Sequence, residues 1–220
     1  SCERGGRPLF APQSFTLSPG QAMQIEGDNG SGKTSLLRMV CGLAPTASGE
    51  VRWGGQAIAE VRHAFSRDLL YLGHSLGLKD ELSALENLRA ASVLAGHPVG
   101  HEQALQALQA QGLGSRSHLP LRVLSQGQKR RSALARLALS TQARLWILDE
   151  PFSALDVAAV AHLEKLIVAY LDGGGSVIFT THQDAAISAR IESSPMSLRS
   201  PIIAWWAEPL TIGMSSPGKS

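Results

Sequence analysis

The chain contains a glycine-rich loop whose residue types suit the binding of a phosphate chain. The loop has the pattern G-x-x-x-x-G-K-[ST], follows an apolar run and precedes a helix-like run. It consists of Gly27, Asp28, Asn29, Gly30, Ser31, Gly32, Lys33 and Thr34. Glycines let the backbone wrap closely around a polyphosphate and aim N–H groups at it. In this pattern Lys33 contacts the β and γ phosphates and the Thr34 hydroxyl binds Mg²⁺. The sequence therefore predicts a nucleotide site.

A pair of acids follows a second apolar run. Leu145 to Leu148 are four apolar residues, and Asp149 and Glu150 come directly after them. We expect Asp149 to hold Mg²⁺ and Glu150 to act as the general base on an attacking water. The alternative is an ordinary strand with an acidic turn, which the glycine-rich loop upstream disfavours.

A third group of residues provides a second possible phosphate-binding helix start. It consists of Leu124, Ser125, Gln126, Gly127 and Gln128. A helix N-terminus carries a partial positive charge and unpaired N–H groups, which suit an anion. A plain helix cap is the alternative. The basic run 129–131 follows, and we interpret it as a solvated helix face or a partner contact.

The elements that must position these residues alternate along the chain. Strands are predicted at 22–26, 50–53, 69–72, 145–148 and 177–180, and helices at 33–41, 83–95, 102–111, 128–139 and 157–171. Gly54 and Gly55 predict a hairpin turn. Strands separated by helices indicate a mostly parallel sheet covered on both faces. Residues 77 to about 124 contain no convincing strand, so we expect a small helical insert there.

The composition fits a globular protein and excludes several classes. The 220 residues are 44% apolar, enough for a sizeable core. The 20 Lys and Arg nearly balance the 18 Asp and Glu, which argues against a dedicated nucleic-acid binder. Two cysteines are too few for a disulfide scaffold. No window predicts a membrane span.

The order of these motifs resembles the nucleotide-binding subunit of ABC transporters. The resemblance covers about residues 8 to 187 and includes a Thr181-His182 pair and a further loop. That loop, the D-loop of the family, is Ser153, Ala154, Leu155 and Asp156. Residues 124–128 match the family's signature segment, which contacts the γ-phosphate bound by the other subunit, and His182 matches its switch histidine. The resemblance thus implies two ATP molecules, with Mg²⁺, sandwiched between two copies of the chain.

The resemblance also sets the expected fold. It implies an α/β P-loop NTPase core of ABC-ATPase type, with a mostly parallel sheet, flanking helices, an antiparallel β portion and the small helical insert. We expect one nucleotide-binding domain over residues 1–187, with the insert at about 77–124. Residues 188–220, rich in Ser and Pro, are expected to form a poorly ordered tail. A docking segment around Trp205 and Trp206 is the alternative.

Finer features resemble one subfamily, the ATP-binding subunit of the bacterial cytochrome c maturation system, also described as a heme exporter. They are Leu72-Gly73-His74, residues 81–88, Phe152-Ser153-Ala154 and Thr181-His182-Gln183. This resemblance implies a peripheral ATPase on the cytoplasmic face of the inner membrane. It would bind integral membrane subunits of that system, and ATP hydrolysis would drive heme export or release of a heme-loaded chaperone. The scattered histidines predict no direct heme binding.

The sequence departs from the family pattern at three places. Ser75 stands where the family usually has a Gln that senses Mg²⁺ and the attacking water. Residues 2–5 contain no aromatic residue to stack on adenine, and Phe10 is the nearest candidate. The tail after about Ile187 does not resemble the subfamily.

Two other functions are compatible with parts of the pattern. The first is a soluble ABC-type ATPase that remodels ribosomes or DNA, although such proteins usually carry tandem nucleotide domains or long coiled coils. The second is an unrelated P-loop GTPase or kinase. The chain has no Asn-Lys-x-Asp segment to read guanine, and the segment 124–128 has no role in such enzymes.

Overall fold

The computed structural model describes residues 3–4, 7–8, 13–46, 48–181, 194–197 and 210–213. Its main sheet has five strands in the order β10-β4-β9-β8-β7. These strands are β4 (Ala22–Glu26), β7 (Leu69–Leu72), β8 (Leu145–Leu148), β9 (Ser176–Thr180) and β10 (Ser194–Ser197). Every neighbouring pair in this sheet is parallel. The carboxyl ends of the strands therefore meet at one edge.

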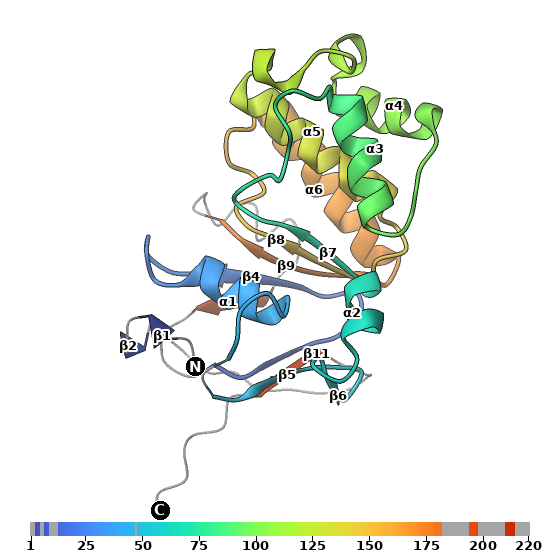
Figure 1. Ribbon diagram of the computed structural model, residues 1–220. Helices are drawn as coiled ribbons and strands as arrows, with labels where there is room; N and C mark the ends of the chain where they lie inside the picture. The colour runs from blue at the N-terminus through green and yellow to red at the C-terminus, as the bar shows by residue number, and fades with distance from the viewer. Residues whose placement is uncertain are drawn as a thin grey trace, which may run out of the picture.

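Helices cover both faces of this sheet, as the alternating pattern predicts (Figure 1). The covering helices are α1 (Lys33–Val40), α5 (Gln126–Leu139) and α6 (Val157–Asp172). Side chains alternate along β8: Leu145 and Ile147 pack with α1, whereas Trp146 and Leu148 pack with α5 and α6. All four β8 side chains are buried. A continuous apolar strand is what a sheet covered on both faces requires.

A smaller sheet lies on the α1 side of the molecule. It contains β3 (Phe15–Leu17), β11 (Leu210–Gly213), β5 (Glu50–Trp53) and β6 (Gln56–Ala57), paired antiparallel in that order. The β5–β6 hairpin turns at Gly54 and Gly55, whose φ values of 56° and 77° suit a type I′ turn. The helix α2 (Arg62–Asp68) follows it. A separate two-stranded pair, β1 (Glu3–Arg4) and β2 (Arg7–Pro8), lies near the N-terminus.

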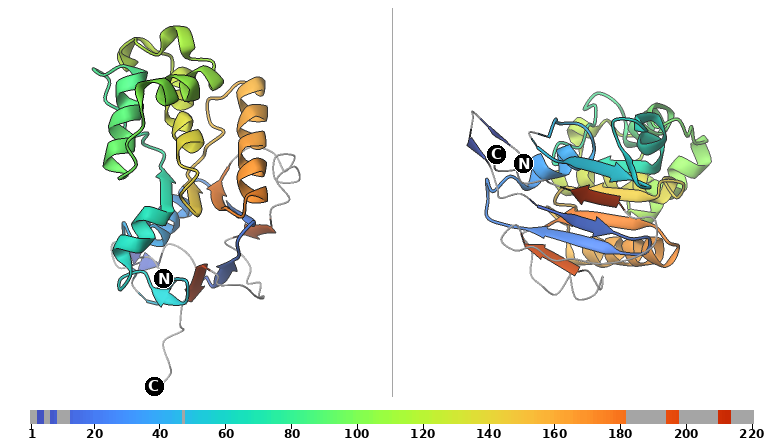
Figure 2. Two further views of the ribbon diagram at one scale, coloured as in Figure 1. Left: turned by 90° about the vertical axis from the view of Figure 1, so that its right-hand side faces the viewer. Right: turned by 90° about the horizontal axis from the view of Figure 1, so that it is seen from below.

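The middle of the chain forms the helical insert. It holds α3 (Ala84–Leu94), α4 (His101–Ala110) and two 3₁₀ turns, η1 (Gly114–Arg116) and η2 (Leu121–Val123). The insert stands apart from the sheets in the side view and packs on α5 through its own apolar core (Figure 2). That core includes Leu85, Leu108 and Leu124. The apolar core of the insert is therefore separate from the two cores that flank the main sheet.

Two short strands lie within residues 188–220. Strand β10 adds to the edge of the main sheet beside β4, and β11 pairs with β3 and β5. An unpaired strand edge offers backbone N–H and C=O groups that a further strand can satisfy. Trp205 and Trp206 lie outside the described residues, as does His182.

Among the residues that the structure describes, no helix is both long enough and apolar enough to cross a bilayer.

Candidate nucleotide site

The residues that the sequence predicts to bind phosphate and to act in catalysis meet at the carboxyl edge of the parallel sheet. The phosphate loop (residues 27–34) follows β4, the acids follow β8, and Thr180 ends β9. Strand β9 lies between β4 and β8, so Thr180 stands between the loop and the acids. The topology, rather than closeness in sequence, brings these residues together.

The phosphate loop is folded around the ammonium group of Lys33. Lys33 is 7% exposed, and its Nζ donates hydrogen bonds to the carbonyl oxygens of Gly27 at 2.7 Å and Asp28 at 3.0 Å. Gly30 and Gly32 have φ values of 81° and 96°, which non-glycine residues rarely adopt. Gly32 is the N-cap of α1 and has no side chain to occupy the helix N–H groups. The end of α1 is therefore left to a ligand anion.

Asp149 is the most enclosed acid of the site. It is 2% exposed, and both carboxylate oxygens accept hydrogen bonds, Oδ2 from Thr34 Oγ1 and Oδ1 from Thr180 Oγ1, each at 2.8 Å. A buried carboxylate is tolerated only when its oxygens are paired in this way. Burial raises the pKa of Tyr71 to about 12, and the negative charge of Asp149 adds to that rise. The charge of Asp149 thus acts on a tyrosine of β7, which packs against the core on the α1 side of the sheet.

The site residues fit a magnesium–phosphate ligand. A hydroxyl and a carboxylate are hard oxygen donors of the kind Mg²⁺ prefers, and those of Thr34 and Asp149 are already in contact. The hydroxyl oxygen of Ser31, in the middle of the phosphate loop, is buried without a protein partner. Such an orphaned polar atom is consistent with a loop completed by ligand oxygens.

Glu150 lies one residue beyond Asp149 in an unusual backbone conformation. Its φ is 51°, in the left-handed region. Its N–H donates to Thr180 Oγ1 at 2.9 Å, and its carbonyl oxygen accepts a hydrogen bond from the Arg130 guanidinium. Burial lowers the pKa of Arg130, whereas the charges of Asp149 and Glu150 raise it. Glu150 is therefore fixed from two sides, by β9 and by α5.

Arg130 is a residue that the sequence interpretation missed. The run 129–131 was expected to be a solvated face or a partner contact, but Arg130 is only 8% exposed. The helical spacing gave a signal: Arg130 stands on the same face as Ala133, Leu134 and Leu137, all buried. A charged residue at an apolar position of an amphipathic helix indicates a buried polar contact.

The signature segment (residues 124–128) begins α5 at the surface. Ser125 is the N-cap: its Oγ accepts from the Gln128 N–H at 3.3 Å, and its own N–H donates to Gln128 Oε1 at 3.0 Å. Leu124 anchors the segment in the core of the insert, whereas Ser125 and Gln126 are exposed. The polar end of the segment is therefore presented to the surface.

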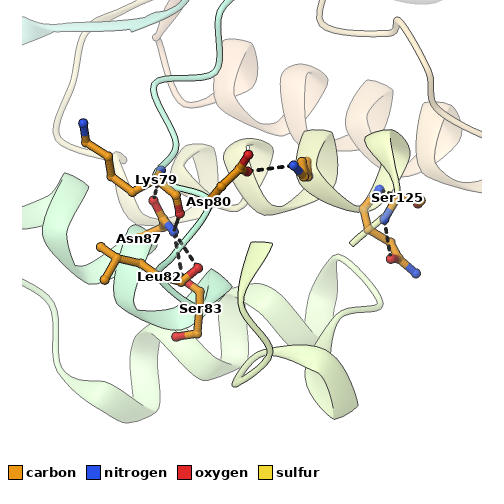
Figure 3. Close-up of polar contacts among 8 residues, drawn as sticks. Lys79, Asp80, Leu82, Ser83, Asn87 and Ser125 are labelled. Carbon is orange, nitrogen blue, oxygen red and sulfur yellow. Dashed lines mark hydrogen bonds and ion pairs between the residues drawn. The ribbon is translucent and has the colours of Figure 1, made fainter. Parts of the chain in front are cut away.

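The loop that joins β7 to the insert is fastened to this helix. Asn87 is buried, and its amide bonds the backbone of Lys79, Leu82 and Ser83 (Figure 3). Asp80 forms an ion pair with Lys129 at 2.7 Å. The insert, the joining loop and the start of α5 are thus held together.

Ser75 lies in the same joining loop. It lines an open cleft of about 370 Å³ with His74, Gln126, Lys129, Arg130 and Ser153. The sequence-predicted residues therefore divide into two groups. The phosphate loop, Asp149 and Glu150 share the carboxyl edge of the sheet, and Ser75 shares a cleft with the signature and D-loop residues.

Residues 10–153 match the family model described as ABC transporter. The chain is 52% identical over 185 residues to a protein of Aromatoleum aromaticum named cytochrome c biogenesis ATP-binding export protein CcmA. That match covers 84% of this chain and 86% of the relative. A protein of the same name from Pseudomonas aeruginosa is 47% identical, over 84% of this chain and 90% of its own length.

Solved structures show the same fold. A putative ABC transporter ATP-binding protein from Pyrococcus furiosus superposes with a TM-score of 0.74, at 25% identity, over 87% of this chain and 91% of its own. An ATP-binding cassette solved as a dimer in a post-hydrolysis state, bound to ADP and Pi, superposes with a TM-score of 0.72 at 23% identity, over 83% of each chain.

Proposed function

Because the chain belongs to the ABC transporter family, and within it to the cytochrome c biogenesis ATP-binding export proteins, we propose that its ATP hydrolysis drives a heme-handling step in cytochrome c maturation. The step is export of heme or release of a heme-loaded chaperone. The observation that carries the proposal is the identity of about half of all aligned residues, which extends over 84% of the chain.

The phosphate loop binds the triphosphate in this proposal. Lys33 would exchange its two carbonyl partners for oxygens of the β and γ phosphates, and the uncapped start of α1 would add N–H donors. Thr34 and Asp149 would hold Mg²⁺, which when bound neutralises charge that develops on the phosphates. Positioning and electrostatic stabilisation account for most of the catalysis of phosphoryl transfer.

Glu150 is the proposed general base, and the signature segment completes the site of a second copy. The Glu150 carboxylate would take the proton of a water aligned with the γ-phosphate. Ser125 and Gly127 would contact that phosphate from another chain, and the exposure of Ser125 at the surface supports this role. His182, which lies outside the described residues, would contact the γ-phosphate, and the D-loop (residues 153–156) would lie at the contact between the copies.

The partners in this proposal are a second copy of the chain and integral membrane subunits. ATP hydrolysis on the cytoplasmic face of the inner membrane would be coupled to those subunits through the insert. No nucleic acid and no direct contact with heme take part.

Genetic complementation tests the proposal. A bacterium that lacks its own cytochrome c biogenesis ATP-binding export protein should regain heme-stained c-type cytochromes when it receives this chain and its membrane subunits. The Glu150→Gln variant should not restore them. Restoration by Glu150→Gln, or co-purification of the chain with ribosomes instead of membrane proteins, would overturn the proposal.

A further inference from the structure

The acidic loop (residues 149–154) contains an unusual backbone. Glu150 and Ala154 have φ values of 51° and 59°, and among the described residues they are the only non-glycine residues with positive φ. Side chains make this region unfavourable, so such residues persist only where the surroundings hold them. Both lie in the loop that carries the proposed base.

One side chain of α5 holds the first part of this loop. The Arg130 guanidinium donates to the carbonyl oxygens of Asp149 at 2.9 Å, of Pro151 at 3.4 Å and of Glu150. Its planar set of donors is suited to gather several carbonyl oxygens at one point. Those carbonyls are drawn together on the side of α5, which fixes the direction in which the Glu150 side chain leaves the backbone.

The start of the same helix lies close against the last part of the loop. A Cβ atom added to Gly127 would lie 2.8 Å from the carbonyl oxygen of Ala154, closer than real Cβ contacts. Gly127 therefore allows the signature segment to approach the D-loop backbone. The two left-handed residues are each in contact with α5, one through Arg130 and one through Gly127.

We propose that Arg130 is a positioning residue for Glu150 and connects the chain's own signature segment to its own general base. The inference rests on the proposed function, in which the signature segment contacts a nucleotide held by a second copy. A small shift of α5 at that contact moves Arg130, only five residues after Ser125, and with it the three carbonyls of the acidic loop. Each nucleotide would thereby set the base of the other site.

The kinetic test uses the full chain with its membrane subunits. Arg130→Gln removes the charge and most of the donors, and Arg130→Lys keeps the charge. The matched control is Arg136→Gln, since Arg136 lies on the same helix near Leu139 and Ser140, away from the acidic loop. We expect Arg130→Gln to lower kcat by roughly 10- to 100-fold with KM for ATP within about twofold, because misplacement of a reacting group acts on the chemical step. Arg130→Lys should recover part of kcat, and Arg136→Gln should match the wild type.

A double variant separates positioning from general stability. In a Glu150→Gln background the residual rate should not fall further when Arg130→Gln is added, because a residue that acts only through Glu150 has nothing left to position. If Arg130→Gln strongly lowers the melting temperature, the test uses Arg130→Lys instead. Its kcat should then be lower than that of the wild type while its KM for ATP stays within about twofold.

Failure of the Arg130 role and failure of the Glu150 role give different kinetic results. An unchanged kcat in Arg130→Gln would overturn the inference. So would an equal fold-loss of kcat when Arg130→Gln is added to the wild type and to Glu150→Gln. Normal hydrolysis by Glu150→Gln alone would instead overturn the assignment of the base.

Discussion

The starts of α1 and α5 are two possible phosphate-binding ends with opposite designs. The start of α1 has a glycine N-cap, a buried lysine and a hydroxyl already paired with Asp149. The start of α5 is exposed, and its Ser125 and Gln128 satisfy each other in a capping box. The first end is assembled within one chain, whereas the second is presented outward, which suits a site completed between two copies.

The N-terminus of a third helix, α3, provides a comparison for the capping box of α5. The N-terminus of α3 has the same capping box, made by Ser83 and Glu86. Ser83 is buried and its partner carries a negative charge, which already satisfies the helix dipole. Gln128 at the matching place in α5 is neutral. The same cap geometry therefore serves structure in α3 and leaves room for an anion at α5.

The largest expected loss of ATP binding comes from a substitution at the α1 end. Lys33→Ala should weaken ATP binding by roughly 100-fold, since it removes a charge-assisted contact of about 3 kcal/mol. The fold should persist, as the Lys33 stem adds little to the core. Titration with a fluorescent ATP analogue measures the loss, and Lys165→Ala, at an exposed position of α6, is the control. Unchanged affinity would contradict the phosphate-loop assignment.

Glu150→Gln should separate binding from hydrolysis. We expect the rate to fall by about 100- to 10,000-fold, the usual contribution of a general base, while ATP affinity remains. A dimer should then accumulate with Mg-ATP and run ahead of the monomer in size-exclusion chromatography. A variant that hydrolyses ATP at the wild-type rate would remove Glu150 from this role.

Exchanging the charged and the neutral capping residue tests whether the starts of α3 and α5 have different roles. Gln128→Glu should lower hydrolysis by about tenfold, because like charges at a phosphate repel, and should leave or raise stability, since an acid suits a helix start. Glu86→Gln should leave hydrolysis unchanged and lower the melting temperature slightly. If Gln128→Glu hydrolyses ATP normally, the α5 start has no anion role.

The loss in Glu86→Gln should also depend on pH. Hydrogen bonds from the Ser83 backbone N–H and hydroxyl lower the pKa of Glu86 below its usual 4.5. The stabilisation is therefore present above that pH and lost as the pH falls through the lowered value. Melting curves of the two proteins should differ at pH 7 and converge in acid; a difference that persists in acid would contradict this account.

Four strands were predictable because a turn or an acid marks where each one ends. The bounds of β4, β7 and β8 in the main sheet, and of β5 in the smaller sheet, agree with the sequence prediction. The helix α2 was missed because only Phe65 in it is buried, which leaves no helical pattern. The edge strand β10 was missed for a related reason: its residues, Ser-Pro-Met-Ser, do not resemble a strand, and pairing with β4 selects the conformation.

Only the residues that belong to a motif were predicted for the site. Residue types and order predict the phosphate loop and the acids, and the structure places both at one edge of the sheet. The roles of Arg130 and Asn87 could not, because both bind backbone groups, 19 to 21 residues away for Arg130, and only the folded chain brings those groups together. Residue types do not indicate which backbone carbonyl groups a side chain will bind.

The smallest change in the hydrolysis rate is expected at Ser75. Its side chain is about two bonds shorter than the Gln of the family, so we expect it to reach the site only through an added water. Ser75→Gln should raise the hydrolysis rate of the complex with its membrane subunits while ATP affinity barely changes. Steady-state ATPase assays measure both quantities, and an unchanged rate would show that another residue has this role.

Complementation between two inactive variants tests the central claim, that each site is shared by two copies, most directly. One variant is Lys33→Ala, and the other carries Ser125→Ala with Gln128→Ala. A mixed dimer of the two has one intact site, formed by Lys33 of one copy and Ser125 of the other. The shared-site account predicts that mixing them restores ATPase activity, to at most about a quarter of the wild-type rate, because random pairing makes half of the dimers mixed and each has one intact site. A mixture no more active than the sum of its parts would contradict it.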